Sequence, residues 1–432
     1  MKLFNKFLFA SVLVLAVSSC AKKGCMDPTA ANYDSVAEKD DGKCDYTYDV
    51  PSEYVFTDGD GNNTVSYSGQ TARMDMLSEM VSYLKTANND ASVTLSASDL
   101  LAMYDNSYTG WSDTSLVGNG KQLKSKTALG DAGIQSMFEG WMNAAAAATP
   151  SSNTSYLQDS SGLEWTQVIE KGLMGACFAS QMTSNYLAGI SSDDNTTVED
   201  GKYYTEMEHH WDESFGYFGA ARDYNTGYSD DSDRKTDPYY DSNGDGSIDF
   251  KSEYNMGWSV TAAKRDVVTA STDYDFTGTI MNAYLEGRTL ITNQAPMEDI
   301  LVQRDIILNT WEKVVAAVSI HYINDTMSDL AALITAADST LSPYNLPAEG
   351  DGYKYNVHWA EMRAYAHGLI YNDFKVISDA DIATVFGYMG TAPAYNDGAD
   401  FSAMQTMHDN LAMAKDVLKA AYSFDDDHMD NW

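Results

Sequence analysis

The sequence is poor in proline and in positive charge, and each shortage excludes a class of protein. Eight prolines in 432 residues exclude a collagen-like or proline-rich chain. The 27 lysines and arginines face 63 acidic residues, which gives a formal net charge of −36. A chain this acidic is not attracted to nucleic-acid phosphates, so we expect no nucleic-acid partner. The 29 tyrosines and 8 tryptophans exclude wholesale disorder.

The sequence also lacks the short motifs of several enzyme classes. It contains no GxxxxGK[ST] phosphate loop and no HExxH, GxSxG or CxxC pattern. Beyond the N-terminal segment, no stretch is apolar enough to predict a membrane span. These absences favour a binding protein over an enzyme and leave metallopeptidase as the enzyme class to test.

The N-terminal segment has the features of a lipoprotein signal. Lys2 and Lys6 precede an apolar run, Leu8 to Val17, that is too short to span a bilayer as a helix. The run ends in Val17-Ser18-Ser19-Cys20, which resembles the bacterial lipobox. That resemblance implies cleavage after residue 19 and lipid on the thiol of Cys20. We therefore expect a protein that is anchored by lipid in the bacterial cell envelope, at the outer membrane.

The remaining cysteines have different predicted roles. Cys25 and Cys44 bracket a short loop in an exported chain, so we predict a disulfide between them within a spacer of residues 20–49. The segment resembles a small Cys-x-Asp-Pro-x-Ala-x-Asn-Tyr…Asp-Asp-Gly-x-Cys module of exported envelope proteins. Cys177 lies in an apolar helical pattern, which indicates a buried, inert thiol.

Helical periodicity dominates the chain from residue 70 onward, and sustained strand alternation is absent. The main apolar helical segments lie near residues 77–84, 134–148, 163–190, 297–323 and 404–418. Residues 224–256 are instead polar and rich in aspartate and tyrosine. We therefore predict an all-α protein in which this polar insertion separates two pseudo-symmetric helical bundles, residues 50–223 and 257–432.

A repeated four-residue pattern is the most informative motif. His210-Trp211-Asp212-Glu213 and His358-Trp359-Ala360-Glu361 both read His-Trp-x-Glu, with one copy in each helical half. Histidine and glutamate three residues apart share a helix face, where they could bind one metal ion. In the first copy Glu206 and His209 extend the same stripe. The alternative is a buried His–Glu hydrogen bond between packed helices, which needs no metal.

With these motifs the sequence resembles the imelysin-like family and uncharacterised exported lipoproteins related to it. The resemblance rests on His210 and Glu213, on the following Phe215-Gly216-Tyr217-Phe218-Gly219, on His358 and Glu361, and on the helical layout. It implies two helical bundles related by duplication, and metal handling as the role. The imelysin signature has a glycine two residues before the histidine, where this chain has Glu208 and Asn356. That departure argues against carrying over peptidase activity.

A second constellation follows the loop of an EF-hand. Residues 241–249 place oxygen-bearing side chains at the loop's alternating positions and Gly246 at its sharp turn. The predicted calcium ligands are Asp241, Asn243, Asp245, Ser247, Asp249 and Glu253. The glutamate comes one residue later than the EF-hand requires. The pattern favours a structural Ca²⁺ loop over a sensor, and an Asx-rich turn without calcium is the alternative.

The sequence thus predicts a cell-envelope lipoprotein that binds a transition metal, iron in first place and zinc in second. Its predicted ligands are His210 and Glu213 with Glu206 and His209, and His358 with Glu361 in the second half. A structural Ca²⁺, the membrane and an outer-membrane transporter complete the expected partners. One alternative is an imelysin-type zinc peptidase with His321 or His367 as its third ligand. The other is a helical glycan-binding surface lipoprotein that uses Trp211 and Trp359.

Overall fold

The computed structural model describes residues 21–28, 30–44, 47–88, 90, 92–150, 157–224, 241, 244–246, 249, 253–268 and 273–432. The predicted signal segment and Cys20 lie outside the described residues. The chain divides into two compact units, residues 1–49 and 50–432. The first boundary coincides with the end of the predicted spacer. The two predicted helical halves pack together as one compact unit.

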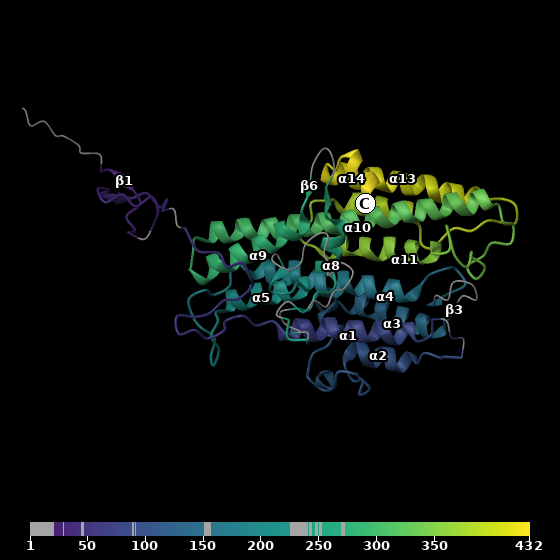
Figure 1. Ribbon diagram of the computed structural model, residues 1–432, viewed down its shortest axis with the longest axis horizontal. Helices are drawn as coiled ribbons and strands as arrows, with labels where there is room; N and C mark the ends of the chain where they lie inside the picture. Colours follow the sequence, from purple (N-terminus) through teal and green to yellow (C-terminus); the bar gives the residue numbers. More distant parts are fainter. Residues whose placement is uncertain are drawn as a thin grey trace, which may run out of the picture. The chain divides into compact units, whose positions relative to one another are not determined.

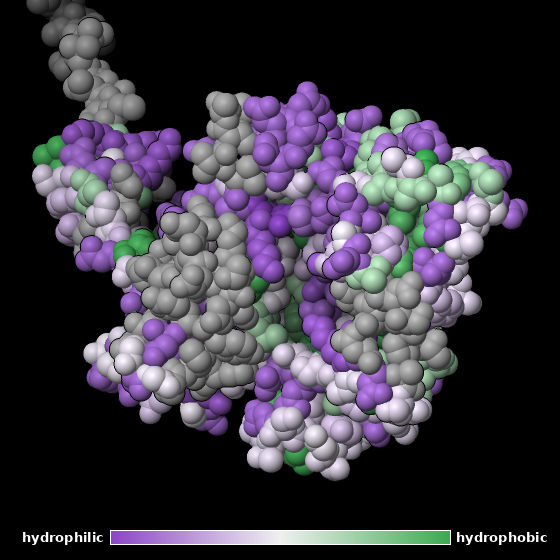
Figure 2. All heavy atoms as spheres, turned by 45° about the vertical axis from the view of Figure 1, so that its right-hand side comes forward, coloured by the Kyte–Doolittle hydropathy of each residue, from purple (hydrophilic) through white to green (hydrophobic). Residues whose placement is uncertain are grey.

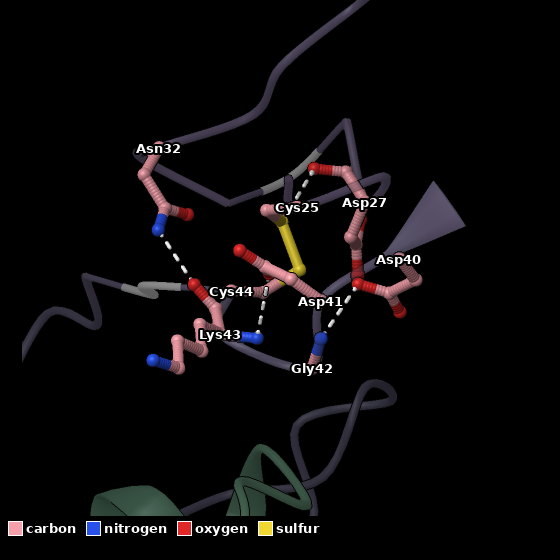
Figure 3. Close-up of a disulfide and its surroundings, with 8 residues drawn as sticks. All are labelled: Cys25, Asp27, Asn32, Asp40, Asp41, Gly42, Lys43 and Cys44. Atoms are coloured by element: carbon pink, nitrogen blue, oxygen red, sulfur yellow. Dashed lines mark hydrogen bonds between the residues drawn. A yellow bond between two sulfur atoms is a disulfide. The ribbon is translucent and has the colours of Figure 1, made fainter. Parts of the chain in front are cut away.

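The described part of the first unit is a small disulfide-linked module. Its strands β1 (Lys23–Gly24) and β2 (Lys39–Asp40) pair in parallel. A disulfide joins Cys25 and Cys44, the pair that the sequence singles out, across a Cα–Cα distance of 4.7 Å (Figure 3). A module this small cannot bury a large core, so the covalent link replaces part of the missing apolar packing.

Polar side chains of the module hold its own turns (Figure 3). The carboxylates of Asp40 and Asp41 accept hydrogen bonds from the backbone N–H groups of Gly42 and Lys43, at 3.1 and 3.0 Å. The side-chain amide of Asn32 donates to the carbonyl of Lys43 at 2.6 Å. These contacts give the Asp-Asp-Gly part of the module a structural role.

The second unit is built mainly from helices, which confirms the predicted all-α class (Figure 1). Its first part contains α1 (Ser68–Lys85), α2 (Ala97–Asp105), η1 (Thr114–Leu116), η2 (Lys124–Gly130), α3 (Ala132–Ala147), α4 (Trp165–Leu173), η3 (Met174–Ala179), η4 (Gln181–Leu187) and α5 (Glu206–Phe218). Its second part contains α8 (Trp258–Arg265), α9 (Phe276–Thr292), α10 (Met297–Ala336), α11 (Tyr355–Ala366), η5 (His367–Tyr371), α12 (Asp379–Met389), α13 (Ser402–Tyr422) and α14 (Asp426–Asn431).

Two-residue strands form the only sheet structure among the described residues of this unit. Strand β3 (Thr149–Pro150) pairs antiparallel with β4 (Leu157–Gln158), and β5 (Val267–Val268) pairs antiparallel with β6 (Asp273–Tyr274). Pairs this short close loops and bury no sheet face of their own. Helix-on-helix packing therefore makes the core.

The long helix α10 is the central element of the second part of the unit. It packs against α9, α11 and α13, and Figure 1 shows it between α13 and α11. Its middle, residues 314–320, is buried on every face. A helix that is apolar all round must be enclosed by other helices, which explains why the sequence of α10 shows no clear polar stripe. Four tryptophans around it and its neighbours are fully buried: Trp211, Trp258, Trp311 and Trp359.

Local sequence fixes both ends of α5, the helix that carries the first motif. The hydroxyl of Thr205 accepts from the N–H of Glu208, and the carboxylate of Glu208 accepts from the N–H of Thr205. The helix ends at Gly219, which has a φ of +81°. A Cβ at Gly219 would lie 2.4 Å from the carbonyl oxygen of Met256, so both the turn and the close packing require glycine.

The segment before α5 runs through two stretches of π-helix, η3 and η4. π-Helix is rare, and its usual form, a single-turn bulge, is frequent at functional sites. Cys177 lies in η3 and is fully buried. Burial raises the pKa of its thiol to about 12, so the thiol stays protonated and inert at neutral pH.

One face of the chain shows how polar and apolar residues are distributed on its surface. The face drawn in Figure 2 is mainly hydrophilic, and hydrophobic residues show there only in small patches. In the part of the chain that the structure describes, no helix combines the length and the apolar character that a membrane span requires.

Candidate metal centre

The two His-Trp-x-Glu segments lie on α5 and α11, and each is anchored by its tryptophan. Trp211 and Trp359 are 0 % exposed. Their indole N–H groups donate to the carbonyls of Tyr284 and Met389, at 3.0 and 3.2 Å. The preceding histidine points about 100° away around the helix and is therefore only partly covered. The buried tryptophans cannot form the exposed sugar platform that the glycan-binding alternative requires.

Each motif histidine is hydrogen-bonded to an aspartate from another segment. Nδ1 of His210 lies 2.8 Å from Oδ2 of Asp193, and Nδ1 of His358 lies 2.8 Å from Oδ2 of Asp329. The hydrogen bond with Asp193 raises the pKa of His210 more than burial lowers it. Burial lowers the pKa of His358, but the hydrogen bond and charge of Asp329 outweigh it, so this pKa is raised too. In both motifs, therefore, an aspartate carboxylate holds Nδ1 of the histidine and fixes the orientation of its ring.

Each motif glutamate lies near a tyrosine whose ring is also close to the motif histidine. In the second copy the hydroxyl of Tyr322 donates to Glu361 at 3.0 Å. In the first copy Gln70 bridges the two side chains, because its amide donates to the hydroxyl of Tyr186 at 3.3 Å and to Glu213 at 2.7 Å. The tyrosine and histidine rings lie 5.5 Å apart in the first copy and 6.1 Å apart in the second, tilted by 46° and 40°. The two copies thus place the same four residue types, His, Glu, Tyr and Asp, near one another, although the tyrosine contacts the glutamate directly only in the second copy.

Sequence reasoning missed the tyrosine and the aspartate of each copy. A signal for them was present, because Tyr186 and Asp193 have the same seven-residue spacing as Tyr322 and Asp329, and each aspartate follows a serine. The segments that carry these pairs lie at different distances from their motifs, 17 and 29 residues before the histidine. The tyrosine–aspartate pair therefore has no fixed spacing from the His-Trp-x-Glu motif, and a search by spacing would not connect them.

One three-residue group in the described part of the chain has the geometry to bind a metal ion. Asp193, Glu206 and His210 each offer one ligand atom, and these atoms lie within 4.8 Å of one another. Asp193 lies in the turn after η4, while the other two lie on the first turns of α5. One imidazole nitrogen and two carboxylate oxygens form a donor set that suits Fe²⁺, Zn²⁺ or Mn²⁺.

The structure brings together only two of the four ligands that the sequence predicts for the first copy. His209 turns to the carbonyl of Ser66, 3.1 Å from its Nδ1, and Glu213 accepts from the side chain of Gln70 at 2.7 Å. A four-residue step turns a helix by about 40°, so positions 206 and 210 share one edge of the stripe and positions 209 and 213 share the other. The segment before α1, together with α1 itself, occupies the second edge.

In the second copy the motif histidine lies near a second aspartate and a second histidine, both on α10. Nε2 of His358 lies 3.9 Å from Oδ2 of Asp325, and Nε2 of His321 lies 3.5 Å from the same oxygen. Burial and Arg265 lower the pKa of His321 to about 3, so its imidazole is neutral at ordinary pH. Glu361 instead bonds Tyr322 and is nearly fully buried. The predicted pair His358 and Glu361 is thus separated into a histidine–aspartate cluster and a tyrosine–glutamate pair.

The other histidine of the peptidase alternative, His367, lies outside both clusters. Its ring packs edge-on against Trp141 and Phe386, with centroid distances of 6.0 and 4.8 Å. Burial lowers its pKa to about 4. These contacts indicate a packing role for His367.

The predicted calcium loop is described only in part. Asn243 and Ser247 lie outside the described residues. The carboxylate of Asp241 accepts from the N–H groups of Gly244 and Gly246, at 2.7 and 2.8 Å. Glu253 is fully buried and accepts from the N–H of Asp249 at 2.8 Å. A calcium ion at Asp241, Asp245 and Asp249 stays a prediction.

The chain belongs to the family described as "Domain of unknown function (DUF4856)", whose match covers residues 51–136 and 142–360. The match contains the first motif, with Asp193 and Glu206, and ends within the second motif, before Glu361. No curated protein and no solved structure matches the chain.

Proposed function

We propose that this protein is a lipid-anchored, imelysin-like protein of the bacterial cell envelope that binds a divalent transition metal, iron in first place. The ligands are Asp193, Glu206 and His210. The observation that carries the proposal is the approach of their three ligand atoms to within 4.8 Å, from two separate segments of the chain. The equivalent His–Asp hydrogen bonds of the two copies, each with a tyrosine and a glutamate nearby, support the duplicated-bundle part of the proposal.

Exposure favours metal exchange over permanent structural binding. The side chain of His210 is 31 % exposed, and Glu206 lies on the surface. A structural metal is usually closed off by its ligands, whereas a site of this kind keeps positions open to water or to a partner. An open site on an envelope lipoprotein suits delivery of metal to an outer-membrane transporter. When bound, the metal would supply only a coordination centre in this role, and no reaction is required.

Metal binding by variants of the mature chain tests the proposal. The protein carries Cys20→Ser in place of the lipid, has no histidine tag and is titrated with Fe²⁺ under anaerobic conditions, and with Zn²⁺. We expect about one ion per chain, and His210→Ala should weaken its binding by at least the roughly 10- to 100-fold that loss of a residue supporting a ligand costs, because here a ligand itself is lost. Asp193→Asn should weaken it in the same direction. Calorimetry and metal analysis after gel filtration provide the two readouts.

His408→Ala is the matched control. His408 is also a partly exposed histidine beside an aspartate, with 3.5 Å between Nδ1 and Asp409, but it belongs to no three-residue group. Its loss should leave the affinity unchanged. Equal metal content in the parent and in His210→Ala would refute the site. If His358→Ala alone removed the metal, the histidine–aspartate cluster on α10 and α11 would take its place. Calcium retained in every variant would point to a separate site.

A further inference from the structure

A cavity of about 350 Å³ lies between α1, α4, η3, α8, α10 and α11. It is large enough for a small organic molecule. Apolar side chains form much of its wall, among them Leu77, Met174, Phe178, Val260 and Val318. The proposed metal ligands Asp193, Glu206 and His210 are not among the residues that line it.

The cavity gathers positive charge in a chain that has little of it. Four of the 27 basic residues line it, Lys85, Lys171, Lys264 and Arg265, together with two acids, Glu170 and Glu361. Lys171 is paired with Glu170 at 2.8 Å. Glu361 is held by the hydroxyl of a tyrosine on α10. The cavity wall is therefore net positive inside a strongly negative protein.

Three of these four cations have no carboxylate within ion-pair distance among the described residues: Lys85, Lys264 and Arg265. Nε and Nη1 of Arg265 are buried and have no hydrogen-bond partner in the described part of the chain. Burial lowers the pKa of Arg265. Buried guanidinium nitrogens are normally hydrogen-bonded, so these two nitrogens of the half-buried Arg265 mark a position where the head of an anion could accept from them.

We propose that this cavity binds a small amphiphilic anion, whose carboxylate or phosphate head contacts Arg265 and Lys264 and whose apolar body packs against Leu77, Phe178 and Val318. The planar fork of arginine can donate two parallel hydrogen bonds to either head group. The acidic surface disfavours anions in general. Recognition therefore depends on the local cluster. This site is independent of the metal centre, so either one can fail without the other.

Displacement of a fluorescent probe tests the proposal on the mature chain with Cys20→Ser. The probe is 8-anilinonaphthalene-1-sulfonate, itself an amphiphilic anion. Octanoate, octyl phosphate, octan-1-ol and inorganic phosphate are the competitors. We expect octanoate or octyl phosphate to compete at least about 10-fold better than octan-1-ol, because charge-assisted hydrogen bonds to the head are lost in the alcohol. The better of the two anions identifies the head group, and inorganic phosphate should compete weakly because it has no apolar body.

Substitution of the cavity cations locates the site. Arg265→Gln should weaken binding of the preferred anion by about 10-fold or more. Lys264→Gln, at an exposed position, should weaken it in the same direction and serves as the second variant if Arg265→Gln does not fold. Arg304→Gln, a change of the same type at an arginine outside the cavity, should have no effect. Equal competition by octan-1-ol, or unchanged affinity in both cavity variants, would overturn the proposal. The variant His210→Ala should bind the anion normally, which separates this result from the metal test.

Discussion

Replacing Arg288 with methionine should lower the free energy of unfolding by about 3–5 kcal/mol, because the change leaves two buried carboxylates without their cation. Arg288 is 0 % exposed. Its Nη1 donates to Glu208 at 2.6 Å, and its Nε donates to Asp212 at 2.9 Å. Glu208 and Asp212 are 6 % and 0 % exposed. Chemical denaturation of the mature chain, read as the change in midpoint at constant slope, measures the loss.

The network around Arg288 connects three parts of the second unit. Its Nη2 donates to the hydroxyl of Thr64 at 3.0 Å. Asp212 also accepts from Tyr54 at 2.8 Å and from the N–H of Ser66 at 3.0 Å. The guanidinium on α9 thereby ties α5 to the segment that precedes α1. Because Asp212 is the third residue of the first motif, the motif carries a structural function as well as any role in metal binding.

Two further proteins separate the charge effect from a simple loss of packing. The triple variant Arg288→Met/Glu208→Gln/Asp212→Asn removes the orphaned charges and should recover more than half of the lost stability. Arg304→Met makes the same substitution at a partly exposed pair, in which the arginine lies 2.7 Å from an aspartate that is 53 % exposed, and should cost at most about 1 kcal/mol. Equal losses in Arg288→Met and Arg304→Met would contradict the argument.

The sequence was sufficient to predict most of the helical architecture. Apolar residues at helical spacing mark several of the long helices, because each helix must bury one face against its neighbours, although the 17-residue helix α9 is not among the predicted segments. The pattern in α10 was harder to interpret, since its middle is buried all round and loses the polar stripe. The packing of residues 50–432 into one compact unit could not be read from periodicity, because periodicity shows which face is buried and does not show which helix covers it.

The candidate metal centre was predictable only along one helix. The sequence placed Glu206, His209, His210 and Glu213 on one stripe, but tertiary neighbours divide that stripe into two edges. Asp193 comes from a turn whose position relative to α5 is set by folding, so motif spacing could not reveal it. The cavity cations are dispersed in the same way over α1, α4 and α8. Neighbours within one turn of a helix can be predicted from the sequence. Residues that converge on a site from several elements can be identified only from the structure.

Glu164→Gln should make the protein more stable at pH 9 while leaving its stability at pH 5 nearly unchanged. Glu164 is the N-cap of α4, where its carboxylate accepts from the N–H of Gln167 at 2.8 Å. The side chain is only 1 % exposed, and its Oε1 has no hydrogen-bond partner in the described part of the chain. Burial raises the pKa of Glu164 from 4.5 to about 7, and the nearby charge of Glu361 contributes to the rise.

The direction of the pH effect follows from proton binding. Between pH 4.5 and 7 the folded state binds more protons at Glu164 than the unfolded state, so the wild-type protein loses stability as the pH rises through this window. The contribution of Glu164 is fully present below pH 4.5 and fully lost above about pH 7. Glutamine keeps the capping oxygen and never ionises. We therefore expect Glu164→Gln to gain on the order of 2 kcal/mol over wild type at pH 9.

Urea denaturation of wild type and Glu164→Gln at pH 5 and pH 9 gives the free energy of unfolding of each protein at each pH. The quantity of interest is how the difference between the two proteins changes with pH, because titrations elsewhere in the chain affect both proteins equally. Glu349→Gln, the same change at an exposed glutamate, should show no such pH-dependent gain. A loss of stability in Glu164→Gln at pH 9 would mean that the ionised carboxylate stabilises the N-terminus of α4 by more than its burial costs. A gain confined to high pH would show that burial keeps Glu164 protonated at lower pH, where α4 is capped by a neutral acid.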